Sequence, residues 1–282
     1  MNKNWKKGIF FLLLFLAVMP MIHMYREQRM QKEIAEKILR FHVIANSDSR
    51  EDQEFMILES RFLEKPAFAV EQGRNAARHM ESESRKALDI ALGLIQKYDE
   101  EQAGRVENIE AKVDRYEDEL GTYLMKLSNA DLSEKDSHSV SIMLHCIGDF
   151  ERISDHAVNI MESARELYEK NLSFSVQAKT ELQVLIATVG RIVDTAYEVF
   201  DKQDMNLTRD VEPLEEIVDE LSKELKRRHV NRLRSGECTI EMGFILTDLL
   251  TSLERIADHC SNISVCVTQV RENLYDTHSH LE

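Results

Sequence analysis

The 282-residue chain contains 9 Gly and 3 Pro, far below the roughly 12% that these two turn-forming residues usually contribute together. Sandwiches and barrels need a turn about every 8–12 residues, so this composition excludes them. The 43% of hydrophobic residues suffices for a core and excludes wholesale disorder. We therefore expect an all-α protein built from long helices.

The formal net charge of −15 repels phosphate backbones, so we expect no nucleic-acid partner. The acidity is concentrated after residue 53, because residues 1–53 carry 9 Lys/Arg against 6 Asp/Glu. Such an acidic body attracts cations. The four cysteines show no Cys-x-x-Cys spacing, so they predict buried thiols rather than a zinc site or a disulfide framework.

An apolar run from Ile9 to Ile22 follows the basic residues Lys3, Lys6 and Lys7. Its 14 residues match the ~7–15 of a signal-peptide core better than the ~17–25 of a spanning helix. We expect residues 1–25 to form a hydrophobic helix that acts as a signal peptide or signal anchor at the membrane. Such a segment would direct the downstream part of the chain out of the cytosol; a buried core helix is the alternative.

Residues 26–60 are expected to form a linker. Glu33–Leu39 has a helical pattern, and Phe41–Ile44 is a candidate short strand that precedes an Asn-Ser-Asp-Ser turn. We find no other convincing strand signal in the sequence.

Within this linker, residues 34–53 (IAEKILRFHVIANSDSREDQ) resemble the start of the stage II sporulation protein R family. Those proteins are exported signals of endospore formers, so the resemblance implies an alternative function as an exported sporulation signalling protein. The similarity stops near Gln53, which predicts a junction near Glu54. A gene fusion or a chimeric sequence assembly would produce such a junction.

From about Arg61 the chain repeats itself with a period near 105 residues. Lys86–Asp89 aligns with Arg191–Asp194, and Glu151–Ile160 aligns with Glu254–Ile263. Solenoid units repeat every ~20–50 residues, so this longer period indicates two copies of one small domain. An α-solenoid array is the alternative, but it needs more repeats.

Each copy divides into three helices, which predicts two tandem three-helix bundles at residues 61–171 and 172–273, followed by a tail at 274–282. The expected helices span 66–101, 106–128, 136–170, 174–204, 209–235 and 239–273. Apolar residues recur at spacings of three and four on the third helix of each copy, which makes one buried stripe per helix. The stripe residues are Phe150, Ile153, Ala157, Ile160, Met161, Leu249, Leu253, Ile256, Cys260 and Ile263.

Four Glu-x-x-x-Asp pairs occupy matching places in the two copies, one on the second and one on the third helix of each. The pairs are Glu110/Asp114, Glu151/Asp155, Glu215/Asp219 and Glu254/Asp258. Residues four apart share a helix face, where two like charges destabilise the helix by a few tenths of a kcal/mol unless a cation neutralises them. Facing pairs would form an oxygen-rich metal site for Mg²⁺, Mn²⁺, Ca²⁺, iron or Zn²⁺. A solvated helix face is the alternative.

His156 and His259 each follow the Asp of a third-helix pair, and Asn159 and Asn262 lie four residues beyond that Asp. The histidines are candidate extra ligands or partners of the ligands, or simply core-edge residues. The asparagines are candidates for orienting the carboxylates or for hydrogen bonds between helices.

A di-iron enzyme of the bundle type needs Glu-x-x-His spacing on two helices. Here the histidine lies five residues after the glutamate in both copies. The sequence also has no Gly-x-Ser-x-Gly motif and no Gly-rich phosphate loop. We therefore expect no enzymatic activity.

The segments Asp149–Ile160 and Ser252–Ile263 resemble the paired signatures of PhoU proteins, and the similarity extends over residues 61–273. The resemblance implies a fold of two three-helix bundles and multinuclear metal clusters on the Glu-x-x-x-Asp motifs. It also implies a role in restraining phosphate uptake and phosphate-starvation signalling.

Glu59–Glu71 (ESRFLEKPAFAVE) further resembles the link into the cytosolic PhoU-like tail of bacterial Na/Pi cotransporters. This implies a regulatory module of sodium-dependent phosphate transport or phosphate homeostasis, whose partner is a phosphate transporter or its membrane domain. The resemblance places the body on the cytoplasmic side, although the N-terminal segment predicts export. We leave open whether the chain forms a homodimer.

Overall fold

The computed structural model describes residues 55–272, and within this range every regular element is helical. The 3-10 helices η1 (Met56–Leu58) and η2 (Ser60–Glu64) come first. The α-helices that come after them are α2 (Pro66–Gln96), α3 (Glu100–Leu127), α4 (Glu134–Glu169), α5 (Val176–Lys202), α6 (Met205–Thr208), α7 (Val211–Arg234) and α8 (Ile240–Arg271). The expected all-α class is confirmed for these residues. The expected hydrophobic helix, the candidate strand Phe41–Ile44 and the tail lie outside them.

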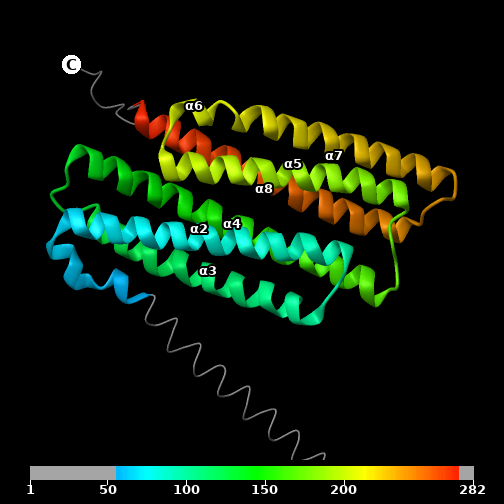
Figure 1. Cartoon of the computed structure of the whole chain (residues 1–282), viewed down its shortest axis with the longest axis horizontal. Helices are drawn as coiled ribbons and strands as arrows, with labels where there is room; N and C mark the ends of the chain where they lie inside the picture. The colour runs from blue at the N-terminus through cyan, green and yellow to red at the C-terminus, as the bar shows by residue number, and fades with distance from the viewer. Residues whose placement is uncertain (1–54, 273–282) are drawn as a thin grey trace, which may run out of the picture. The chain divides into compact units, whose positions relative to one another are not determined.

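The helices form two three-helix bundles (Figure 1). Bundle one consists of α2, α3 and α4, and bundle two consists of α5, α7 and α8, with the short α6 between α5 and α7. The bundles meet chiefly where α4 packs against α8. The predicted pair of bundles is therefore present, and the third helix of each copy lies at their contact.

Side-chain caps fix where four of the long helices begin. The oxygens of Asp99, Ser133, Ser175 and Thr239 each accept the backbone N–H three residues on, at 3.0–3.3 Å. Such a cap stabilises a helix by about 1 kcal/mol because it satisfies an otherwise unpaired donor. Pro66 begins α2, where the missing N–H of proline costs no hydrogen bond.

The first helix break lies earlier than the sequence predicts. We expected helices at 66–101 and 106–128, whereas α2 ends at Gln96 and α3 begins at Glu100. The reason is the cap at Asp99, whose carboxylate accepts the N–H of Gln102 at 3.0 Å. A second difference is the short helix α6, which we did not predict from the sequence. It comes after α5 and its capping residue Gln203, whose backbone is left-handed with φ of 51°.

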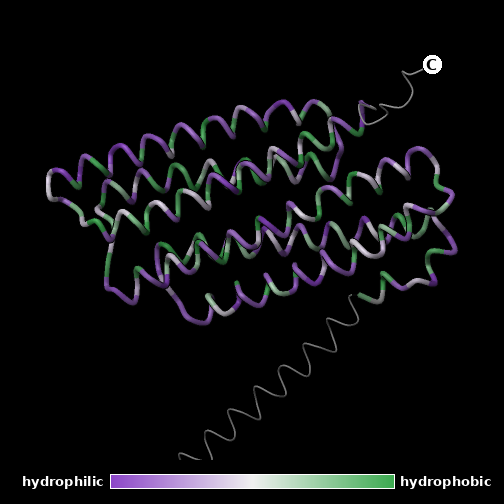
Figure 2. The backbone as a smooth tube through the Cα atoms, turned by 180° about the vertical axis from the view of Figure 1, so that it is seen from behind, coloured by the Kyte–Doolittle hydropathy of each residue, from purple (hydrophilic) through white to green (hydrophobic). Residues whose placement is uncertain are grey.

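The apolar stripes on α4 and α8 form the centre of the core. All ten predicted stripe residues, five on each helix, have 0% of their surface exposed. Figure 2 shows hydrophobic and hydrophilic residues alternating along the helices, as expected when each helix buries one face. The spacing of three and four thus predicted the buried faces correctly.

Aromatic side chains extend the core from bundle one into bundle two. The ring of Phe150 on α4 meets Tyr197 and Phe200 on α5 edge-on, with centroids 5.3 and 5.0 Å apart. The Tyr197 hydroxyl donates to Ser84 Oγ at 3.2 Å, and Ser84 donates to the carbonyl of Phe150 at 2.8 Å. This contact links α2, α4 and α5. Each edge-on aromatic pair adds about 0.5–1.5 kcal/mol of stability beyond that from its buried area.

Two ion pairs line the α2–α5 edge of the same contact. Arg78 Nε lies 2.6 Å from Asp201 Oδ1, and Arg85 Nε lies 2.9 Å from Asp194 Oδ1. The bundles are thus held by the packing of α4 against α8 and by a charged edge at α2–α5. No helix within residues 55–272 is both long enough and apolar enough to cross a membrane.

The aromatic contact gives a stability prediction. Phe150→Ala should lower the free energy of unfolding by about 3–5 kcal/mol, since it removes a fully buried ring and leaves a cavity. Phe244→Ala is the matched control, because Phe244 on α8 is 68% exposed, and it should change stability by less than about 0.5 kcal/mol. Urea unfolding followed by circular dichroism measures both; equal losses would contradict the role of Phe150.

Candidate functional site

The structure brings the two carboxylate pairs of bundle one together. This acid cluster one consists of Glu110 and Asp114 on α3 with Glu151 and Asp155 on α4. The pKa of Glu110 is raised, first by burial and then by the charges of Asp155 and Asp114. Because Asp155 belongs to the neighbouring helix, the α3 and α4 pairs lie close enough to repel each other.

Glu151 has the most perturbed carboxyl of this cluster. Burial, then the negative charge of Asp155, raises its pKa from 4.5 to about 7, and its hydrogen bond with Asp155 acts in the same direction. Arg152 opposes this shift; its Nε lies 3.3 Å from Glu151 Oε2, and its Nη1 lies 3.0 Å from Asp155 Oδ2. With a pKa of about 7, the Glu151 carboxyl is about half protonated at neutral pH.

Acid cluster two consists of Glu215 and Asp219 on α7 with Glu254 and Asp258 on α8. The pKa of Glu215 is raised, first by burial and then by Asp219 and Asp258. The two pairs of bundle two thus also face each other. Glu254 differs from its counterpart Glu151, because Lys226 Nζ lies 2.9 and 3.0 Å from its two carboxylate oxygens.

The carboxylates gather at both clusters without converging on one point. In the part of the chain from 55 to 272, no group of three or more His, Cys, Asp or Glu side chains has the spacing of a metal site. The donors are nevertheless all carboxylate oxygens, which Mg²⁺, Mn²⁺ and Ca²⁺ prefer. The metal assignment of these eight residues stays a prediction.

The histidines next to the clusters lie at the contact between the bundles. The rings of His156 on α4 and His259 on α8 are 5.8 Å apart between centroids. His259 Nδ1 lies 2.9 Å from Asp149 Oδ1, and Asn262 Nδ2 donates to the same oxygen at 3.3 Å. Burial, then the neighbouring His259, lowers the pKa of His156. Asn262 thus makes the inter-helix hydrogen bond that was one of its two predicted roles, while Asn159 contacts His156 at 3.4 Å.

Three charged residues near the clusters are absent from the predicted set. Glu117 raises the pKa of Glu151, Lys226 pairs with Glu254, and Asp149 pairs with His259. Glu117 lies three residues after Asp114, and Lys226 lies seven after Asp219, so helical periodicity could have placed both on the cluster face. The Asp149 contact needs the pairing of α4 with α8, which the sequence pattern alone does not give.

Two hollows lie between α2 and α5, away from the acid clusters. The larger, of about 620 Å³, is lined by Arg78, Arg85, Asp194 and other charged residues, including Glu81. Burial, then the charge of Asp201, raises the pKa of Glu81 to about 8, against the opposing effect of Arg78. Most of the lining charges pair with each other, so this cleft is part of the contact between the bundles.

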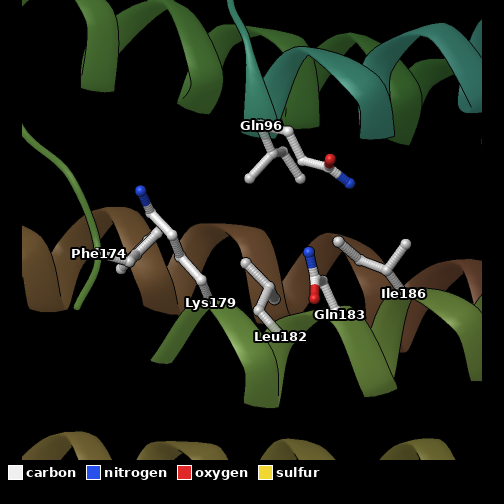
Figure 3. Close-up of a pocket in the computed structure, with 7 residues that line it drawn as sticks. Gln96, Phe174, Lys179, Leu182, Gln183 and Ile186 are labelled. Atoms are coloured by element: carbon white, nitrogen blue, oxygen red, sulfur yellow. The ribbon is translucent and has the colours of Figure 1, made fainter. Parts of the chain in front are cut away.

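The smaller hollow, of about 180 Å³, lies between Ile95 and Gln96 at the end of α2 and the start of α5. Figure 3 shows Phe174, Leu182 and Ile186 beside it, together with the side chains of Gln96, Lys179 and Gln183. It offers apolar surface and no cluster of ionisable groups.

A model of the PhoU domain matches the chain twice, over residues 77–164 and 182–267, which together make up more than half of it. The chain belongs to the PhoU family. Each match falls within one bundle, so the internal repeat corresponds to two PhoU domains. The resemblance of residues 34–53 to sporulation proteins lies outside both matches and stays a prediction.

Two curated PhoU proteins are similar to this chain. The "Phosphate-specific transport system accessory protein PhoU homolog 1" of Thermotoga maritima is 29% identical over 115 residues, which are 41% of this chain and 49% of that protein. The chain therefore spans about half the length of this relative. The corresponding PhoU homolog of Deinococcus radiodurans is 23% identical over 191 residues, covering 67% of this chain and 88% of that protein.

Solved PhoU structures share the fold. PhoU from Pseudomonas aeruginosa superposes with a TM-score of 0.67 at 23% identity, covering 73% of this chain and 98% of that one. The phosphate transport system regulatory protein PhoU from Streptococcus pneumoniae gives a TM-score of 0.66 at 16% identity, covering 74% and 98%. At these identities the similarity establishes the two-bundle fold of the PhoU-family chain.

The raised pKa of Glu151 predicts how stability depends on pH. The folded state holds this proton more tightly than the unfolded state, whose carboxyl titrates near 4.5, so the stabilisation is present below about pH 4.5 and is lost as pH rises through about 7. The side chain of Glu151→Gln cannot titrate. The free energy of unfolding of this variant should therefore fall less than that of the wild type as pH rises through about 7.

Chemical unfolding in EDTA at a series of pH values from about 5 to about 8 measures this effect. Glu162→Gln, on the exposed face of the same helix, controls for the loss of one carboxylate. A Glu151→Gln profile that parallels the wild type would contradict the assignment.

Proposed function

We propose that this PhoU-family chain is a regulatory module of phosphate transport that acts by binding and performs no chemistry of its own. The observation that carries the proposal is the double PhoU-domain match on both bundles. The curated relatives of Thermotoga maritima and Deinococcus radiodurans are named as accessory proteins of phosphate-specific transport systems, which supports the same role.

The partner in this proposal is a membrane transporter of phosphate, or its membrane domain, that contacts the bundles on the cytoplasmic side. The resemblance of Glu59–Glu71 to the tail of Na/Pi cotransporters favours a sodium-dependent transporter. These residues include η2 and the start of α2, where bundle one begins. The described residues of the body contribute no membrane-spanning helix, so transport itself would belong to the partner.

Metal binding is the finer part of the proposal. In acid cluster one, Glu110, Asp114, Glu151 and Asp155 would hold a divalent or iron-type cation through their carboxylate oxygens. Burial, and then the repulsion between neighbouring carboxylates, raises the pKa values of Glu110 and Glu151; the repulsion supports this assignment, because a cation would relieve it. Bound metal would supply positive charge that draws α3 and α4 together at this point.

The regulatory role is tested by phosphate uptake in the host organism. Deleting the gene should raise uptake of radiolabelled phosphate in phosphate-replete cells, because the restraint on the transporter is lost, and expression of the wild-type chain should restore it. Uptake that does not change after deletion would contradict the proposed role.

The metal assignment is tested separately on the purified full-length chain. Replacing all four residues of acid cluster one by Ala should remove most of the bound metal measured by inductively coupled plasma mass spectrometry. The matched control is Glu162→Ala/Glu166→Ala, which removes an acid pair of the same spacing from α4. Equal metal content in both variants would refute the ligand assignment and leave the uptake result standing.

A further inference from the structure

Helix α7 carries a lysine where its counterpart α3 carries a glycine. An offset of 105 residues along these helices pairs the buried Leu120 with the buried Leu225, and it pairs Gly121 with Lys226. Lys226 lies seven residues, about two helical turns, after Asp219, so it shares the helix face that carries the acids. The two halves therefore differ in charge next to their carboxylates.

The Lys226 ammonium group forms an ion pair with the carboxylate of Glu254 on the facing helix. Its Nζ lies 2.9 Å from one oxygen and 3.0 Å from the other. The side chains of Lys226 and Glu254 are only 40% and 22% exposed, so water screens this pair less than a fully exposed one. Both oxygens through which Glu254 would ligate a metal ion thus already have a cation.

Two further acids of acid cluster two also have cationic partners. Lys223 lies 3.1 Å from Asp219, and Arg255 lies 3.2 Å from Asp258. Together with Lys226, these side chains neutralise three of the cluster's acids, which leaves Glu215. Glu216 and Glu212 still place negative charge beside Glu215, so the barrier to a divalent ion at this cluster is the ammonium group at Glu254.

Acid cluster one has the opposite balance. Of the basic residues between 55 and 272, Arg152 is the one that pairs with its acids, through Glu151 and Asp155. Glu110 and Asp114 form no ion pair with any residue of the described range, and the charge of Glu117 adds to the repulsion felt by Glu151. Within the described residues, no lysine pairs with an acid of cluster one as Lys226 does with Glu254.

We infer that Lys226 is a built-in cation that closes acid cluster two to metal, so that the chain binds metal through acid cluster one alone. A divalent ion entering cluster two would have to displace the ammonium group from Glu254 and would then be repelled by it at short range. The inference rests on the proposed function for its second half, the occupancy of cluster one. Its first half, the exclusion by Lys226, is independent of that proposal.

The test titrates Mn²⁺ into the full-length chain and follows free Mn²⁺ by electron paramagnetic resonance. Lys226→Ala should gain additional bound Mn²⁺, with cluster two tightening by about tenfold or more because a unit charge next to the ligands is removed. Lys226→Arg keeps the charge and should not gain it. Adding Glu254→Ala/Asp258→Ala to Lys226→Ala should abolish the gain.

The reciprocal variant places the same charge in bundle one. A Cβ at Gly121 would meet Ile147 Cδ1 at 3.6 Å, an ordinary contact, so a larger residue fits there. Gly121→Lys should weaken Mn²⁺ binding at acid cluster one by about tenfold. Gly121→Ala adds the Cβ without the charge and should leave Mn²⁺ binding unchanged.

The outcomes separate this inference from the proposed function. Wild-type Mn²⁺ binding that falls on Glu254→Ala/Asp258→Ala would overturn the closure of cluster two, as would Lys226→Ala that folds by circular dichroism and gains no Mn²⁺. If the wild type binds no Mn²⁺ while Lys226→Ala does, the closure by Lys226 stands, but occupancy of cluster one and the proposed metal role both fail.

Discussion

The contact between α4 and α8 is the interaction on which the rest of the molecule depends. Each helix carries five fully buried stripe residues, and the removal of apolar surface from water is the main force that packs helices against their neighbours. The same two helices carry one acid pair of each cluster. The packing of α4 against α8 therefore fixes where these two acid pairs lie, and α3 and α7 complete the clusters.

Much of this arrangement could be predicted from the sequence because the same helical pattern occurs twice along the chain. Two copies of one pattern predicted two three-helix bundles, and the spacing of Phe150, Ile153 and Ala157 predicted the buried face of α4. The first helix break was misplaced because the cap at Asp99 decides it, whereas the apolar periodicity continues without a clear stop.

The candidate site was only partly predictable. Spacing predicted that Glu110 and Asp114 share one helix face, and the structure places them opposite Asp155. Which cation approaches each acid depends on side chains that reach across from another helix, as Lys226 does to Glu254. The role of Asp149 at His259 depends on the register of α4 against α8, which no local pattern specifies.

The charged edge between α2 and α5 has a consequence for how firmly the two halves are joined. Its ion pairs, Arg78 with Asp201 and Arg85 with Asp194, are partly exposed, so dissolved salt weakens them, whereas salt screens the buried packing of α4 against α8 far less. The two bundles are thus joined firmly where α4 packs against α8, and more weakly, by ion pairs, along the α2–α5 edge. Rising ionic strength would therefore weaken the α2–α5 contact before the α4–α8 contact.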